Sequence, residues 1–485
     1  MLVQGLTVTD VKCFSPETTI DLMAGRESPH KWVVIYGGNG LGKSTLLRAF
    51  GIALTGQPAL NALFPSTEGW VRSPATQAWI GVRIQKTSGD KSPGAPRVRP
   101  IGLGVGLVGP HYLENNAVVY PAHSVFPYEN WQNIEKRGQR KETKQLNEDV
   151  KLFKEHISSD EPKRGWLLCG YGPHRRLSGA SSELSERIPP EGRAARLITL
   201  FHEGAALTSS ERWLIKLQHY ALRDKGAAKR RLEAIIQIIN TSLLHGDVVL
   251  DEITPEGVTF KTPFSSKIPF GDLSDGYRSV LALTLDLLRH VEYAFEIESV
   301  LEFKEGRAVV TAEGVVLIDE IDAHLHPSWQ RTIGAWLHER FPNMQFIVTT
   351  HSPLIATRVS DTEGLVVRLV RRKIQRGKEF VDVVTEEGTI GRTVDQHLTS
   401  PSFGLTTTRD VLAEEKAAEI ERLRARVQTK KASPAERKKL RVLEAEYERI
   451  APATATYGEM EGWREDEERI RRANEKAAVE EAAKR

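Results

Sequence analysis

Short, continuous apolar runs recur along the chain and predict strands that are buried on both faces. They span residues 32–36, 314–318 and 346–350. Such runs are typical of central parallel strands, because helices cover both faces of that kind of sheet. Apolar residues at helical spacing follow the first run from residue 45, and a strongly apolar helix is expected from residue 280. The pattern predicts an α/β fold.

A glycine-rich loop follows the first apolar run. Residues 37–44 read GGNGLGKS and fit the pattern GxxxxGK[ST] without a mismatch. A strand, such a loop and a helix N-terminus together bind phosphate, because backbone N–H groups converge there and the helix dipole is positive. Lys43 is predicted to reach the β- and γ-phosphates of ATP, and Ser44 to offer its hydroxyl to Mg²⁺. The predicted ATP-binding residues are Gly38, Asn39, Gly40, Leu41, Gly42, Lys43, Ser44 and Thr45.

Two acidic residues, Asp319 and Glu320, end the second apolar run. They lie where ligands of open α/β sheets bind, at the carboxyl end of a strand. Adjacent strand residues point to opposite sides, so the two carboxylates are expected to have different roles. Asp319 is predicted to hold Mg²⁺, directly or through water. Glu320 is predicted to orient and deprotonate the attacking water.

Two histidines shortly after these acids, His324 and His326, raise the question of a metal site. Imidazole is a frequent zinc ligand, but no cysteine or third histidine stands nearby in the sequence. The favoured interpretation is a turn, with Pro327 starting the next helix.

A second candidate anion site precedes the apolar helix at residue 280. Residues 273–276 read LSDG, and serine followed by glycine at a helix N-terminus can bind an anion without a lysine. One cradle suffices for the chain's own nucleotide, so Ser274, Asp275 and Gly276 are predicted to serve the nucleotide of another copy. Taken alone, this segment would be an ordinary helix cap. His351 ends the third apolar run and is predicted to sense the γ-phosphate, with a structural histidine as the alternative.

In their order along the chain, the four motifs resemble those of the ABC class of ATPases, in the soluble branch with SMC, RecF and OLD-type proteins. The resemblance covers about residues 1–50 and 165–400. It implies an ABC-type ATPase head with a P-loop mixed sheet, a helical signature arm and inserted segments, in which two heads enclose two ATP molecules. Ser274 and Gly276 would then contact the γ-phosphate bound by the partner head. Asp275 stands where transporters usually have glycine.

Further segments resemble the ATPase subunit of Septu-type anti-phage systems, including those attached to some retrons. They are residues 170–176, 211–214, 327–346 and 399–408. That family pairs its ATPase with a separate HNH nuclease, so the resemblance implies an HNH partner that this chain regulates in phage defence. Arg175, in the first of these segments, is a candidate nucleotide-proximal residue, with an ordinary surface arginine as the alternative.

Composition limits the function classes. The net charge of +3, from 67 basic and 64 acidic residues, does not argue for nucleic acid overall. Arg140, Lys141 and Lys144 could contact nucleic-acid phosphates, and a solvated helix face is the alternative. Two cysteines, Cys13 and Cys169, form no disulfide framework and fit a reducing cytoplasm. With no signal peptide and no apolar run of about 18 residues, a cytoplasmic protein without a membrane span is expected.

Residues 1–408 are predicted to form the head, with an insertion at about 86–165 and the signature arm at about 200–292. A helical or coiled-coil region for binding a partner is expected over 409–485. Its helices at about 413–428 and 437–449 should pack antiparallel, with a capping box between Ser433 and Glu436. A third, charged helix is expected from about residue 463. Candidate partner anchors are Tyr457, Met460 and Trp463, and a solvated tail is the alternative.

Two other functions stay open from the sequence. A RecF- or SMC-like clamp would bind DNA directly and depend on ATP; without a sustained heptad pattern, only a short-armed clamp fits. A nucleotide-locked scaffold would bind ATP without turnover, and the presence of Glu320 argues against it. The sequence contains no recognisable HNH core and no Toprim motif after His351, so the chain is expected to lack a nuclease centre of its own.

Overall fold

The computed structural model describes most of the first 400 residues and two helices beyond them. The described residues are 1–85, 87, 101–109, 111–112, 118–119, 122–127, 167–175, 188, 192–205, 207, 209–223, 226–241, 248–357, 364–373, 379–387, 411–429 and 432–450. The chain divides into two compact units, residues 1–397 and 398–485. Outside the described residues lie the charged stretch at 135–142, the segment 399–408, and Tyr457, Met460 and Trp463.

A six-stranded mixed sheet forms the centre of the first unit. Its strand order is β18–β17–β3–β16–β15–β9, with β3 (Trp32–Tyr36), β16 (Met344–Thr350), β15 (Gly314–Ile318), β9 (Leu168–Tyr171), β17 (Leu365–Lys373) and β18 (Glu379–Glu387). All neighbours are parallel except the β17–β18 pair. Every residue of β3, β15 and β16 is buried, as the unbroken apolar runs predict.

A second, antiparallel sheet has the order β2–β1–β4–β5–β8. Its strands are β1 (Leu2–Val11), β2 (Phe14–Asp21), β4 (Gln77–Gln85), β5 (Ile101–Val108) and β8 (Ala122–Pro127). A short pair, β6 (His111–Tyr112) with β7 (Val118–Val119), lies between β5 and β8 in sequence. Strands β5 to β8 therefore fall within the insertion expected at about 86–165, which contributes two strands to this sheet.

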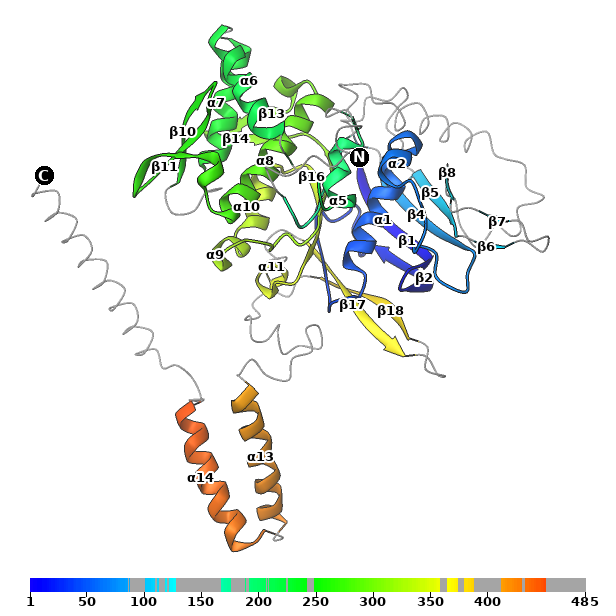
Figure 1. The fold of residues 1–485 in the computed structure, drawn as a ribbon, viewed down its shortest axis with the longest axis vertical. Helices are drawn as coiled ribbons and strands as arrows, with labels where there is room; N and C mark the ends of the chain where they lie inside the picture. The colour runs from blue at the N-terminus through cyan, green and yellow to red at the C-terminus, as the bar shows by residue number, and fades with distance from the viewer. Residues whose placement is uncertain are drawn as a thin grey trace, which may run out of the picture. The chain divides into compact units, whose positions relative to one another are not determined.

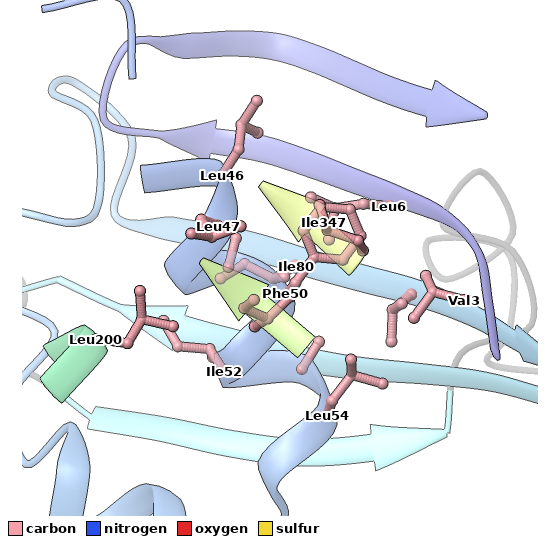
Figure 2. Packing of buried hydrophobic residues seen from close by; sticks show 14 of the residues in the cluster. Val3, Leu6, Leu46, Leu47, Phe50, Ile52, Leu54, Ile80, Leu200 and Ile347 are labelled. Carbon is pink, nitrogen blue, oxygen red and sulfur yellow. The ribbon is translucent and has the colours of Figure 1, made fainter. Parts of the chain in front are cut away.

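Helix α1 (Lys43–Thr55) joins the two sheets into one core (Figure 1). Figure 2 shows side chains of α1, among them Leu47 and Phe50, gathered with Leu6 of β1, Ile80 of β4 and Ile347 of β16. Helix α2 (Gln57–Leu63), the turn η4 (Ala195–Leu197) and α5 (Ile198–Phe201) complete this region. Because α1 starts at Lys43 and is buried along most of its length, the phosphate loop is anchored to an extensive hydrophobic cluster.

The region from residue 209 to residue 294 contains the predicted helical arm. Its helices are α6 (Ser209–Arg223), α7 (Ala227–Asn240) and α8 (Asp275–Ala294), drawn in green in Figure 1. Glu292 of α8 accepts hydrogen bonds from Trp213 of α6 and Arg231 of α7, both at 2.5 Å. A three-stranded sheet, β10 (Val249–Thr254), β11 (Gly257–Thr262) and β12 (Ser265–Pro269), and the turn η5 (Phe270–Asp272) stand between α7 and α8. The arm is therefore not wholly helical.

A strand-rich segment precedes β15. It consists of the turn η6 (Ile297–Ser299) and the hairpin β13 (Leu301–Lys304) with β14 (Arg307–Val310). Three short helices follow β15 and β16, namely α9 (Pro327–Gln330), α10 (Ile333–Arg340) and α11 (Pro353–Thr357). None of the described helices combines the length and the apolar character that crossing a membrane requires.

The second unit contains a helical hairpin of α13 (Val411–Gln428) and α14 (Pro434–Ile450). Ile420, Leu423 and Leu440 form its small buried cluster. The predicted capping box is present, because the Ser433 N–H donates to Glu436 at 2.8 Å and the Glu436 N–H donates to the Ser433 hydroxyl at 3.2 Å. The two helices therefore form as expected, and the third helix expected from about residue 463 lies outside the described residues.

Candidate nucleotide-binding site

The carboxyl ends of three adjacent parallel strands bring the predicted motifs to one edge of the mixed sheet. The glycine-rich loop follows β3, the two acids follow β15, and His351 follows β16. The paired registers Thr350↔Tyr36 and Ile318↔Val348 place these strand ends side by side. Open α/β sheets bind ligands at such an edge.

The loop before α1 needs glycine at residue 42. Gly42 has φ of +91°, and a Cβ there would lie 2.5 Å from Cys13 Sγ and 2.8 Å from the Phe14 ring. Both the backbone conformation and the close packing on the β1–β2 turn exclude a side chain. Gly38, Asn39 and Gly40 are exposed, while Leu41, Ser44 and Thr45 are partly buried. The exposed loop leaves its backbone N–H groups open to an anion.

The side chain of Lys43, the first residue of α1, extends back to the backbone of the glycine-rich loop. Its ammonium donates to the carbonyls of Gly37 at 2.9 Å and Gly38 at 3.2 Å. Burial lowers the pKa of Lys43, and the opposing attraction comes from Glu320, Asp319 and Asp322. The ammonium therefore interacts electrostatically with the acids after β15, even though they are some 280 residues later in the chain.

Asp319 and Glu320 have different surroundings. Asp319 is only 2% exposed, and its carboxylate accepts a hydrogen bond from the Thr349 hydroxyl at 2.5 Å. The Glu320 N–H donates to the same hydroxyl at 2.8 Å, while the Glu320 side chain is partly exposed. Thr349 of β16 thus fixes both residues, and sequence reasoning missed it because a threonine inside an apolar run has no distinguishing signal.

The structural reason for this difference corrects the sequence argument. Strand alternation was expected to separate the two carboxylates, but β15 ends at Ile318 and both acids belong to the following turn. Glu320 has φ of +45°, a left-handed conformation that is uncommon outside glycine. The turn, rather than the strand pleat, separates the two side chains.

His351 begins the turn after β16, and its side chain is exposed. Its backbone N–H donates to Asp322 Oδ1 at 3.2 Å, and the Thr350 hydroxyl donates to the same oxygen at 2.5 Å. Asp322 therefore joins the turn after β15 to the turn after β16. It lies three residues beyond Asp319. The only indication of this role in the sequence is that the residue is acidic.

The two histidines after the acids form a turn, as the favoured interpretation expects. His324 has φ of +64° and is exposed. His326 caps α9, because its Nδ1 accepts a hydrogen bond from the Ser328 N–H at 3.3 Å, and Pro327 starts that helix. In the part of the chain that the structure describes, no group of three or more histidine, cysteine or acidic side chains could hold a metal ion.

The signature segment lies at the N-terminus of α8. Ser274 occupies the cap position, and its side chain and that of Asp275 are exposed. Gly276 packs against the turn after β15, since a Cβ there would lie 2.7 Å from the His324 carbonyl oxygen. The rings of Tyr277 and Trp329 meet edge to face at 4.8 Å. Among the described residues, this segment therefore contacts the turn before α9, with Ser274 and Asp275 left accessible.

Arg175 is buried, so the alternative of a surface arginine is wrong. It is 6% exposed, and it donates to the Ser279 hydroxyl on α8 and to carbonyls of the turn after β15. Burial lowers the pKa of Arg175 to about 10, and the attraction of Asp322, Asp319 and Glu320 opposes that effect. Arg175 is buried against the backbone of the turn that contains the two acids, and it is not one of the exposed residues of the glycine-rich loop.

A cavity of about 370 Å³ opens beside the tip of the phosphate loop, at Gly40 and Leu41. Its charged lining residues are Lys12, Arg72, Arg371 and Glu379, with Arg371 and Glu379 3.6 Å apart, so basic groups outnumber acidic ones there. Arg72 is fixed by donating to the carbonyls of Cys13 at 2.8 Å and Glu379 at 3.0 Å. The phosphate loop and this cavity together could hold an anion with a bulky substituent.

These features resemble those of an ABC-type ATPase head: a phosphate loop, a pair of acids, a histidine turn and an exposed signature segment occur on one α/β fold. Models of known families match two parts of the chain. Residues 192–357 match "AAA domain, putative AbiEii toxin, Type IV TA system", and residues 6–78 match "AAA domain".

The chain is related to the Septu protein PtuA. It is 29% identical to that protein of Bacillus mycoides (strain KBAB4) over 248 residues, which cover 51% of this chain and 30% of the relative. It is 36% identical over 140 residues to "Retron Vc95 probable ATPase" of Vibrio cholerae serotype O1 biovar El Tor, covering 29% of this chain and 26% of that protein. The matched segments thus span about a third or less of these relatives.

An SMC head solved with the C-winged helix domain of ScpA aligns with 80% of this chain and 98% of its own. The identity is 15% and the TM-score 0.44, too low to establish a shared fold. The resemblance to an ABC-type head therefore rests on the topology, the motif geometry and the sequence relatives.

Proposed function

We propose that the chain binds ATP with Mg²⁺ and hydrolyses it. The observation that carries this proposal is that the glycine loop after β3 and the acids after β15 lie at one edge of the mixed sheet, where Glu320 and Asp319 attract the Lys43 ammonium. A cation within a glycine loop and acids on the opposite side suit a nucleotide phosphate with its metal ion. The relatives described as probable ATPases support the same activity.

The residues present fit a magnesium ion. Ser44 at the start of α1 and Asp319 at the end of β15 offer a hydroxyl and a carboxylate, and Mg²⁺ prefers oxygen ligands. Bound there, the ion would neutralise charge that develops on the phosphate oxygens. Glu320 would orient and deprotonate the attacking water, and His351 would hydrogen-bond the γ-phosphate.

The cavity beside Gly40 and Leu41 would receive the nucleoside. Its position continues the phosphate loop, and Arg72 in its lining is fixed by hydrogen bonds to two backbone carbonyls. A preformed pocket with few fixed polar groups is the usual form of a small-molecule site.

Hydrolysis would occur between two copies of the chain. Ser274, Asp275 and Gly276 lie at the N-terminus of a 20-residue helix, and the first two are exposed. A helix N-terminus attracts an anion, and the chain's own phosphates already have the loop before α1. The segment is therefore suited to close the nucleotide of a second head.

The biological role we propose is control of a partner HNH nuclease in anti-phage defence, in the cytoplasm. It rests on the relationship to a Septu protein and to a retron ATPase. ATP would hold two heads together, and loss or hydrolysis of ATP would release or activate the nuclease. The chain would bind nucleic acid directly or through that partner.

The test combines catalysis with partner capture. The purified full chain should release phosphate from ATP with Mg²⁺ and stop when the metal is chelated. Co-expressed with the protein encoded beside it, the chain should capture an HNH protein whose nuclease activity changes with ATP concentration. Capture of no such protein, with ATP-dependent DNA binding by the chain alone, would favour a RecF-like clamp instead.

A further inference from the structure

Arg175 connects three parts of the head that are far apart in sequence. It follows β9, and its Nε donates to the Ser279 hydroxyl on α8 at 2.9 Å. Its other nitrogens donate to four carbonyls of the turn after β15, those of Asp319 at 3.1 Å, Glu320 at 3.3 Å, Ala323 at 3.3 Å and Ile321 at 3.5 Å. Nη1 also donates to the Gly172 carbonyl at 3.4 Å, so the five N–H groups of the planar guanidinium serve six acceptors and at least one N–H is shared. A lysine ammonium, with three N–H groups on one nitrogen, cannot make this set of contacts.

The turn that Arg175 holds contains the proposed catalytic carboxylate. Glu320 and His324 both have positive φ, at +45° and +64°. Such conformations persist in non-glycine residues only where the surroundings enforce them. The hydrogen bonds from Arg175 run along this stretch, and they are therefore a direct means of keeping Glu320 in its unusual conformation.

The contact with Ser279 extends this control to the signature helix. Ser279 lies one helical turn beyond Gly276, and it is 3% exposed. Gly276 itself packs against the His324 carbonyl at the far end of the same turn. A shift of the N-terminus of α8 would therefore change two contacts with the turn, one at His324 and one through Arg175.

We propose that Arg175 is a positioning residue that sets the Glu320 carboxylate and couples it to the signature helix through Ser279. Contact of Ser274 with the nucleotide of a second head would then be transmitted within the same chain to its own hydrolytic carboxylate. This inference rests on the proposed function. It adds Arg175 as a positioning residue, and it adds a structural connection between the signature segment and the hydrolytic carboxylate of the same chain.

The test uses matched substitutions in the full chain. Arg175→Lys keeps the positive charge but removes the planar guanidinium that donates to several acceptors at once. Ser279→Ala removes only the hydrogen bond between Arg175 and α8. Arg340→Lys is the control for replacing a buried arginine, because Arg340 is 2% exposed and donates to the Ala308 carbonyl, away from the site. Thr284→Val is the control on α8, where the Thr284 hydroxyl donates to the carbonyl of Val280 in the same helix.

Arg175→Lys should lower kcat for ATP by about tenfold to a hundredfold, the usual effect of a misplaced catalytic group, while the Kd for ATP changes by less than about threefold. Ser279→Ala should keep ATP affinity, lower kcat by about threefold to tenfold, and reduce the Hill coefficient of hydrolysis towards 1. Both controls should retain wild-type kcat and cooperativity. Melting temperatures measured alongside show whether each variant is folded.

The outcomes separate this proposal from the function on which it rests. If Arg175→Lys and Ser279→Ala match their controls while the wild type hydrolyses ATP, the positioning role is wrong and the ATPase function stands. If Arg175→Lys does not fold, a wild-type kcat and Hill coefficient for Ser279→Ala would still refute the coupling. If the wild type neither binds nor hydrolyses ATP, the proposed function itself is wrong, and this role falls with it.

Discussion

A buried charge cluster in the middle of α8 makes a testable prediction about stability and pH. Asp286 is 2% exposed, and its carboxylate lies 2.8 Å from the Arg289 guanidinium and 3.2 Å from Nε2 of His290. His290 is fully buried, and among the described residues its Nδ1 has no hydrogen-bond partner. A neutral imidazole can donate from Nε2 to Asp286, and the Arg289 Nη2 that lies 3.0 Å from the same nitrogen then donates to the Asp286 carboxylate at 2.8 Å instead.

Burial lowers the pKa of His290 from its ordinary 6.5 to about 4, and the attraction of Asp286 only partly opposes it. The unfolded chain therefore binds a proton at His290 at a higher pH than the folded chain does. The contribution of neutral His290 to folding stability is fully present above the ordinary pKa of 6.5. It is lost as the pH falls towards about 4, the pKa of His290 in the folded chain. Between about pH 7.5 and about pH 5 this linkage amounts to about 2 kcal/mol.

Asp286 changes stability in a different pH range. Burial alone would raise its pKa, but His290 and Arg289 outweigh that effect and hold the pKa well below its ordinary 3.8. Its contribution is thus present above pH 3.8 and is lost only at lower pH. The window between about pH 7.5 and about pH 5 therefore reports on His290 rather than on Asp286.

The assay is the melting temperature of the full chain across this pH window. In the wild type His290 should contribute a fall of about 2–4 °C towards pH 5, and His290→Gln should lack this part of the pH dependence. His219→Gln is the control, because the ring of His219 is exposed on α6. The slopes are compared rather than the absolute values, since glutamine also changes the packing. An equal pH slope in the wild type and His290→Gln would refute the reasoning.

Three further predictions concern the nucleotide site. Lys43→Ala should weaken ATP binding by about tenfold to a hundredfold in calorimetry, because a charged hydrogen-bond donor to phosphate is lost. Full ATP affinity in this variant would contradict the predicted phosphate-binding role of the glycine-rich loop. Glu320→Gln should lower hydrolysis by about a hundredfold or more while ATP still binds, and unchanged hydrolysis would mean that another group is the base. Gly42→Ala should weaken ATP binding, since its Cβ would lie 2.5 Å from Cys13 Sγ. Gly25→Ala is the matched control, because Gly25 also has positive φ but has no atom within 4 Å of such a Cβ.

The sequence predicts well those parts of the fold in which one local pattern has one structural meaning. Unbroken apolar runs become β3, β15 and β16, and the glycine loop leads into α1 at Lys43. The capping box at Ser433 and Glu436 forms with both of its hydrogen bonds. In each of these places a few neighbouring residues determine the conformation, so a single sequence is sufficient.

Strand order and the antiparallel sheet could not be predicted in this way. Nothing local to β17 indicates that it pairs with β3, more than 300 residues earlier in the chain. The same holds for β1, which pairs with both β2 and β4. Pairing depends on which hydrophobic faces meet α1 from opposite sides, and many strands in one chain share the same alternation.

The turn after β15 shows why a site can be correctly placed in a sequence while the arrangement of its residues is not. The two acids are recognisable because they end an apolar run. Their separation depends on the positive φ of Glu320, on the hydroxyl of Thr349 and on the guanidinium of Arg175. Arg175 is 145 residues from Glu320 in the chain, and a single arginine has no periodicity that reveals its burial. The groups that determine the carboxylate geometry therefore come from the segment after β9, from β16 and from the turn after β15, and only the folded sheet brings them together.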